Sequence, residues 1–180
     1  CQPSSEKYRF ALTCIPMYLI ISGTNRRESF TLRVADLYHS LLKEKKIEAP
    51  VLSLIGLELL ERNPSVLELE KKWLLPADKF VFISPEYNGS IPGVLKCLID
   101  VTDRKVWKGK KALLTGVSKG RAGNLRGMDH LTGIMHYVGT VVHPNKLPIS
   151  IVDTLFNEDE LQHRETLQAI NQQLDEFIDF

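Results

Sequence analysis

Three polar loops hold the residues of this sequence whose types could do chemistry, and the first is SGTNRRESFT at residues 22–31. It offers the hydroxyls of Thr24, Ser29 and Thr31 and the guanidinium of Arg26, just where a helix is expected to begin near Ser29. Free amides at a helix N-terminus bind anions, and an arginine adds a charge-assisted contact. Neither GxGxxG nor GxxxxGKS/T is present, so the pattern predicts a site for one phosphate rather than a pyrophosphate. An ordinary helix cap with a solvated arginine is the alternative.

The other two loops are suited to a flat ligand. SPEYNGSIPG, residues 84–93, ends an apolar run and holds Tyr87 between the carboxylate of Glu86 and the amide of Asn88. GVSKGRAGNLRG, residues 116–127, has glycines that let the backbone approach a ligand closely, although a plain connector is the alternative. Together the three loops predict a ligand with one phosphate and a planar polar ring, which is the shape of FMN.

Apolar, strand-like segments alternate along the chain with amphipathic segments, and these elements must position the loops. Strands are expected at residues 17–22, 50–55, 79–84, 110–117 and 140–143, and helices over 30–42, 95–99, 125–138 and 167–178. This alternation predicts an α/β fold with a doubly wound, five-stranded parallel sheet and helices on both faces. Ligands of such sheets bind beyond the carboxyl ends of the strands, where the loops after the first, third and fourth strands lie.

Length and composition bound the class of protein. The chain has 180 residues with a net charge of +1, which favours neither a nucleic-acid nor a membrane partner. No apolar stretch reaches the roughly 18 residues of a membrane helix. Its three cysteines form no CxxC pair, which indicates a reducing compartment and a cytoplasmic location. The five histidines lack metal-ligand spacing, so no metal is expected.

The first residues read differently from the rest. Residues 1–16, CQPSSEKYRFALTCIP, resemble neither a strand nor a helix and are assigned to an N-terminal extension of unclear role. A lipid-modified Cys1 is one possibility. Residues 17–180 are expected to form a single domain.

The loops also carry a resemblance to a known family. SGTNRRES resembles the GSxRxxS phosphate loop of the NADPH-dependent FMN reductases, with Thr24 in the first hydroxyl place. PEYNGSIPGVLKCLID at residues 85–100 resembles the family's segment PEYN followed by GxxPxxLKNxID. The third loop is similar to its SGGxxGG turn. The similarity in order and spacing runs from about residue 17 to residue 142.

The resemblance implies a flavodoxin-like fold, bound FMN, and reduction by NADPH or NADH of a small-molecule acceptor such as a flavin, quinone or azo compound. It also implies a ping-pong mechanism, a homodimer or higher homo-oligomer, and no catalytic side chain, because the flavin does the chemistry. The residues that it assigns to the cofactor are Thr24, Arg26, Ser29, Phe30, Thr31, Pro85, Glu86, Tyr87, Asn88, Ser118, Lys119 and Gly120.

The chain departs from the family pattern at Lys119 and Asn124, which replace glycines, and at Cys97, which replaces an asparagine. Lys119 either brings a cation to the flavin's pyrimidine edge or points into solvent. Two alternatives to an enzyme stay open: an FMN-binding electron carrier, although such carriers tend to be strongly acidic, and a redox sensor. A phosphoryl-accepting receiver is excluded, because it needs an acidic cluster where this chain has Ser22-Gly23-Thr24.

Overall fold

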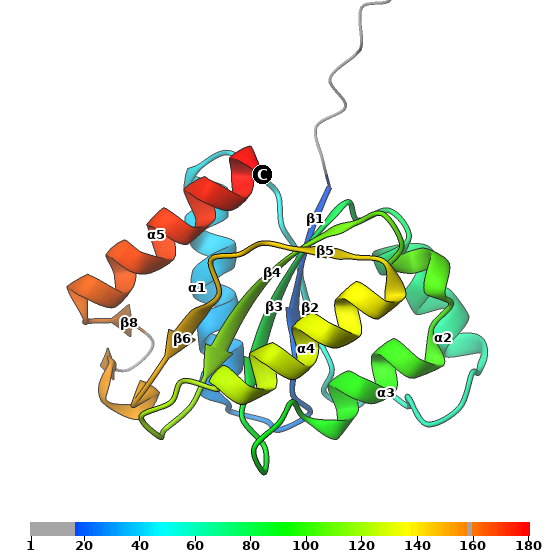
Figure 1. Cartoon of the computed structure of the whole chain (residues 1–180), viewed down its shortest axis with the longest axis horizontal. Helices are drawn as coiled ribbons and strands as arrows, with labels where there is room; N and C mark the ends of the chain where they lie inside the picture. Colours follow the sequence, from blue (N-terminus) through cyan, green and yellow to red (C-terminus); the bar gives the residue numbers. More distant parts are fainter. Residues whose placement is uncertain (1–16, 158–159) are drawn as a thin grey trace, which may run out of the picture.

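A computed structural model describes residues 17–157 and 160–180 of the chain. At its centre is a parallel sheet in the order β2-β1-β3-β4-β5, with helices on both faces (Figure 1). The strands are β1 (Tyr18–Ser22), β2 (Val51–Ser53), β3 (Lys79–Pro85), β4 (Lys111–Val117) and β5 (Val141–Val142). The predicted doubly wound, parallel sheet is confirmed. The expected extension at residues 1–16 lies outside the described residues.

Successive side chains of a strand point to opposite faces of the sheet, so strands that are apolar along their whole length make both faces apolar. Leu19 and Ile21 of β1 pack into one core, covered by α2 (Pro64–Leu69), α3 (Gly93–Val101) and α4 (Leu125–Val138). Tyr18 and Ile20 pack into the other, beneath α1 (Phe30–Glu44) and α5 (Arg164–Asp179). The four predicted helices are present, and their apolar stripes face the sheet.

The fifth position of the sheet differs from the expectation of one strand at residues 140–143. β5 pairs with the start of β4, and a further strand, β6 (Leu147–Ile149), pairs in parallel with its end. Pro144 follows directly after His143 and has no N–H to donate to a ladder, which accounts for a break at this point. The chain then continues through β6 toward the carboxyl ends of the central strands.

Several elements were not predicted. α2 passes at Glu70 into a π-helical turn, η1 (Glu70–Leu74), so its helical spacing changes after six residues and leaves only a short apolar stripe. Two single-turn 3₁₀ helices, η2 (Arg104–Val106) and η3 (Val152–Thr154), and a hairpin of β7 (Phe156–Asn157) and β8 (Glu160–Leu161) complete the fold. Within residues 17–157 and 160–180, no helix is long and apolar enough to cross a membrane.

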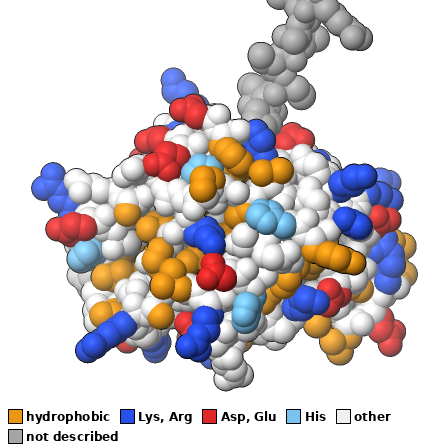
Figure 2. All heavy atoms as spheres, viewed as in Figure 1, with side chains coloured by type: hydrophobic (Ala, Val, Ile, Leu, Met, Phe, Trp, Pro, Cys, Tyr) orange, Lys and Arg blue, Asp and Glu red, His pale blue; other side chains and the backbone are white. Residues whose placement is uncertain are grey.

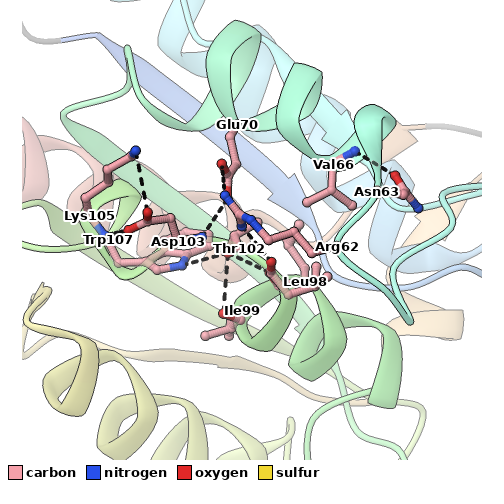
Figure 3. Close-up of polar contacts among 11 residues, drawn as sticks. Arg62, Asn63, Val66, Glu70, Leu98, Ile99, Thr102, Asp103, Lys105 and Trp107 are labelled. Carbon is pink, nitrogen blue, oxygen red and sulfur yellow. Dashed lines mark hydrogen bonds and ion pairs between the residues drawn. The ribbon is translucent and has the colours of Figure 1, made fainter.

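A polar cluster joins η1 to the chain that follows α3 (Figure 3). The buried carboxylate of Glu70 accepts hydrogen bonds from the two terminal guanidinium nitrogens of Arg62, at N···O distances of 2.6 and 2.8 Å. It also accepts one from the backbone N–H of Asp103 at 2.5 Å. Beside it, Thr102 accepts the indole N–H of Trp107 at 3.0 Å and donates to the Leu98 carbonyl at 2.7 Å. These hydrogen bonds fasten η1 to the end of α3.

Candidate functional site

The three predicted loops meet at the carboxyl ends of β1, β3 and β4, along the lower edge of Figure 1. Together they line an open cavity of about 710 Å³. β1 has β2 on one side and β3 on the other, so the cavity lies where the strand order reverses. The loops after the first, third and fourth strands thus line one cavity, and its role as the ligand site stays a prediction.

The first loop ends at the N-terminus of α1. Ser29 has extended backbone angles, and its hydroxyl accepts the N–H of Leu32 at 3.2 Å, so α1 begins at Phe30 as expected. Thr31 lines the cavity although it is only 2% exposed. Arg26 and Arg27 are exposed at the cavity mouth. Hydroxyls, guanidinium groups and helix amides thus gather at one end of the cavity.

The second loop is a tight hairpin. The backbones of Tyr87 and Ser90 exchange hydrogen bonds of 2.9 and 3.1 Å across Asn88 and Gly89. Both central residues have positive φ, 53° and 77°, which is the geometry of a type I′ turn and the reason that an Asn-Gly pair suits it. The turn fixes the backbone of Pro85, Glu86, Tyr87 and Asn88 along one wall of the cavity.

Tyr87 connects the second loop to the first. Its hydroxyl shares a hydrogen bond of 2.6 Å with that of Thr24, and the guanidinium carbon of Arg26 lies 4.1 Å from the centre of its ring. The Thr24 hydroxyl also accepts the backbone N–H of Arg26 at 3.2 Å. Thr24 is 1% exposed and is not among the lining residues of the cavity. In this structure its hydroxyl therefore forms hydrogen bonds within and between the two loops. Its assignment to phosphate stays a prediction.

The backbone of the third loop is hydrogen-bonded to the end of β6 and to the segment that follows it. The Ser118 N–H donates to the Ile149 carbonyl at 3.0 Å, and the Ser118 carbonyl accepts the N–H of Val152 at 3.1 Å. The Gly120 carbonyl accepts the N–H of Ile151 at 3.2 Å. The Ser118 hydroxyl closes the turn by donating to the Gly120 carbonyl at 2.8 Å. Backbone is therefore presented to the cavity in a fixed arrangement.

Charge around the cavity is predominantly positive. Its lining includes four basic side chains, those of Arg26, Arg27, Lys119 and Arg121, and two acidic ones, those of Glu28 and Glu86. Lys119 and Arg121 are exposed and form no ion pair with a carboxylate in the part of the chain that the structure describes. Figure 2 shows Lys and Arg side chains at this lower edge of the molecule. Such a field attracts anionic ligands.

The ammonium group of Lys119 lies 5.7 Å from the centre of the Phe30 ring. Phe30 itself is the first residue of α1 and also contacts Phe156, with their ring centres 6.0 Å apart. The third loop is thus close to the start of α1, where the first loop ends.

The cavity contains residues that the sequence patterns did not single out. Arg27 and Glu28 lie between the predicted residues Arg26 and Ser29, so their position in the sequence could have identified them. Gly89 belongs to the Asn-Gly signature of a type I′ turn, which is also visible in the sequence. Val152 had no such signal, because it reaches the cavity only through the course of the chain after β6. Val117, Arg121 and Ala122 lie within the predicted third loop but were not singled out as ligand contacts.

Metal ligation has no support among residues 17–157 and 160–180, where no group of three or more His, Cys, Asp or Glu side chains could hold an ion. Two of the histidines have other contacts. His130 shares a hydrogen bond of 2.8 Å with Ser90, and the ring of the buried His143 lies 4.9 Å from that of Phe180. Cys97, half-buried, packs against the core beneath α3.

Comparison with known proteins gives concordant matches. A family model described as NADPH-dependent FMN reductase matches residues 16–154. A 2-hydroxy-1,4-benzoquinone reductase of Burkholderia sp is 31% identical over 132 residues, 68% of this chain and 72% of the relative. An NAD(P)H-dependent FMN reductase of Pseudomonas aeruginosa is 33% identical over 118 residues, 62% of this chain and 63% of the relative, just under two thirds of its length.

The fold has the same kind of match. A flavoenzyme NAD(P)H:(acceptor) oxidoreductase from Paracoccus denitrificans superposes with a TM-score of 0.77 at 25% sequence identity. That match covers 92% of this chain and 96% of the other.

Proposed function

The chain belongs to the NADPH-dependent FMN reductase family, as its loop motifs predicted, and from that membership we propose that it reduces a small quinone-, flavin- or azo-type acceptor at the expense of NAD(P)H, with FMN bound among its three loops. The observation that carries this proposal is the convergence of all three loops on one cavity at the switch point of the sheet. Family members that the chain resembles are named for NAD(P)H and for quinone or flavin acceptors.

The residues present fit FMN. A cavity of about 710 Å³ is within the usual range of ligand pockets, roughly 300–1,000 Å³. One end carries a helix N-terminus, hydroxyls and guanidinium groups, which suit a phosphate. The rest is walled by two backbone segments and the ring of Tyr87, which suit a flat heterocycle with polar edges.

At the phosphate end, we assign the anion to Ser29, Thr31 and Arg26, with the N–H of Phe30 at the start of α1 and with Thr24 as the predicted further hydroxyl. Arg26 would leave its place above Tyr87 to bind a phosphate directly, because a charge-assisted bond to an anion is stronger than a cation–π contact at an exposed site. This exchange would free the face of the Tyr87 ring.

At the other end, Pro85, Glu86, Tyr87 and Asn88 would line one side of the flavin ring, and Ser118, Lys119 and Gly120 would meet its other edge. When bound, FMN supplies the redox chemistry, accepting reducing equivalents from NAD(P)H and passing them to the acceptor. The chain's own part is to hold the ring between two fixed loops and to keep a positive field at the mouth. We assign no side chain as an acid or base.

The acceptor and the nicotinamide are proposed to use the same open side of the cavity in turn, which gives ping-pong kinetics. Its exposure to solvent at the mouth supports this, since Lys119, Arg121 and Asn88 are all exposed there. Parallel lines in double-reciprocal plots of NAD(P)H against a quinone are expected. Intersecting lines would contradict the ping-pong order.

An electron carrier or redox sensor is the alternative, and one experiment separates it from a reductase. The protein is incubated with FMN, desalted, and mixed anaerobically with NADH or NADPH while the flavin absorbance is followed. Rapid bleaching of a retained flavin band by one nucleotide supports the reductase and identifies its donor. A retained band that does not bleach supports a carrier or sensor.

We also propose that residues 17–180 act as one domain and that the protein is a cytoplasmic homodimer. A groove between α3 and α4 supports a subunit contact, because it is lined by Ile99, Ile134 and Val138 and bordered by Tyr137, which is 78% exposed. Light scattering on the purified protein tests the dimer, and a mass of one chain would contradict it.

A further inference from the structure

Asn124 joins two of the loops that form the cavity. It is the last residue of the third loop before α4 and is completely buried, with 0% of its surface exposed. Its side-chain nitrogen donates to the carbonyl oxygen of Ser84 at 2.8 Å, across 40 residues of sequence. Ser84 lies at the end of β3, next to Pro85, where the second loop begins. This bond adds a side-chain link to the backbone hydrogen bond of 3.2 Å that the Glu86 N–H donates to the Val117 carbonyl between the same two loops.

The backbone around Asn124 leaves room for this side chain. A Cβ atom on Gly127 would lie 2.0 Å from the side-chain oxygen of Asn124, and one on Gly116 would lie 3.0 Å from its Cβ. Gly116 belongs to β4 and Gly127 to the first turn of α4. Two glycines on neighbouring elements are thus needed for Asn124 to reach β3.

Asn124 also has two features that reduce stability. Its backbone is left-handed, with φ of 65° and ψ of 34°, a conformation that glycine adopts with less strain. Its side-chain oxygen is buried and has no hydrogen-bond partner within the described part of the chain. A strained residue with a buried, unpaired acceptor beside a ligand cavity points to a functional constraint rather than to a stabilising one.

We propose that Asn124 is a positioning residue that sets the second loop against the third and so determines how the flavin ring lies between them. Because its hydrogen bond holds the carbonyl of Ser84, it fixes the peptide from which Pro85 and Tyr87 follow, while its own backbone ends the loop that begins at Ser118. This inference rests on the proposed function, since it concerns the ring of FMN.

The test compares the unaltered protein with Asn124→Asp and Asn124→Gly. The aspartate has the same size but no N–H to donate to Ser84, and the glycine accepts the left-handed backbone without strain, so it folds even where the aspartate does not. The control is Asn63→Asp. Asn63 also precedes a helix and donates its side-chain N–H to a carbonyl, that of Glu58 at 3.2 Å, but it lies outside the cavity.

Affinities for FMN and for riboflavin, which lacks the phosphate, are measured by flavin fluorescence, together with the midpoint potential of bound FMN. We expect both Asn124 variants to bind FMN and riboflavin more weakly by the same factor, roughly 2- to 12-fold for one lost hydrogen bond. The midpoint potential of bound FMN should also shift. Asn63→Asp should change neither.

Unchanged affinities and potential in Asn124→Gly would overturn the inference, and so would a loss confined to FMN, because that would place the effect at the phosphate. Failure of the unaltered protein to bind FMN would instead overturn the proposed function, and this inference with it.

Discussion

Two polar regions of the molecule differ in how their charges are paired. Around Glu70, the carboxylate and the groups that face it are joined by short hydrogen bonds, and Glu70 is only 3% exposed (Figure 3). Around the cavity, Lys119 and Arg121 are exposed and have no carboxylate partner in the described residues.

The comparison separates stability from binding. Burial gives the paired charges of the Glu70 cluster their effect on folding, since removing one partner leaves the others uncompensated. Exposed, unpaired cations contribute little to folding and remain free to meet an anionic ligand. Substitutions in the two regions should therefore affect different measurements.

The largest effect on folding is expected from Glu70→Ala, which leaves the N–H of Asp103 without its acceptor and leaves Arg62 with only the carbonyl of Val101. The free energy of unfolding should fall by about 2–3 kcal/mol in urea titrations, while affinity for FMN stays within twofold. The control is Glu68→Ala on the exposed side of α2, which should change stability by less than about 0.5 kcal/mol. A similar loss from both variants would mean that the cluster has no special role.

The largest effect on binding is expected from Arg26→Ala combined with Ser29→Ala. FMN should bind roughly 10- to 100-fold more weakly because a charged contact and a hydroxyl contact to phosphate are lost, whereas riboflavin should bind as before. Because Ser29 caps α1, the same protein should also lose about 1 kcal/mol of stability. An equal loss for riboflavin would move the phosphate away from the first loop.

A pH effect of intermediate size is expected at Glu70. Burial alone would raise the pKa of its carboxyl, but the hydrogen bonds from Arg62 and the N–H of Asp103 outweigh burial, so the pKa lies below its usual 4.5. A carboxyl group whose pKa is lower in the folded state stabilises the protein at pH values above its unfolded-state pKa. This stabilisation is lost as the pH falls through the folded-state pKa. The stability difference between the unaltered protein and Glu70→Gln should be constant above about pH 5 and shrink below 4.5. A difference independent of pH would argue against this ionic role.

The smallest effect is expected from the hydrogen-bonded hydroxyls of Thr24 and Tyr87. Thr24→Val and Tyr87→Phe each remove the 2.6 Å hydrogen bond, so Tyr87→Phe should lower stability by about 1 kcal/mol. Thr24→Val should lower it more, because the Arg26 N–H also loses its acceptor, and the double variant should lose little more than Thr24→Val. Additive losses would show that the two hydroxyls act separately. Weaker FMN binding in Thr24→Val than in Tyr87→Phe would support the predicted contact of Thr24 with phosphate.

The sequence by itself determined the sheet, the order of its elements and the three loops at its carboxyl edge. These features depend on local signals: apolar runs for buried strands, stripes three and four residues apart for helices, and hydroxyls, glycines and prolines where strands end. The motifs in these loops also identified the family, because their order and spacing belong to one stretch of chain. Short or broken elements, such as α2 with η1 and the interrupted fifth strand, had signals too weak to read.

Only the tertiary structure decided which polar groups meet. The bond between Thr24 and Tyr87 spans 63 residues, that between Asn124 and Ser84 spans 40, and that between Asp103 and Glu70 spans 33. No local pattern specifies such pairs, because each depends on how helices and strands pack against one another. Val152 reached the cavity for the same reason. Packing thus determined which hydroxyls face the cavity and which form hydrogen bonds within the protein.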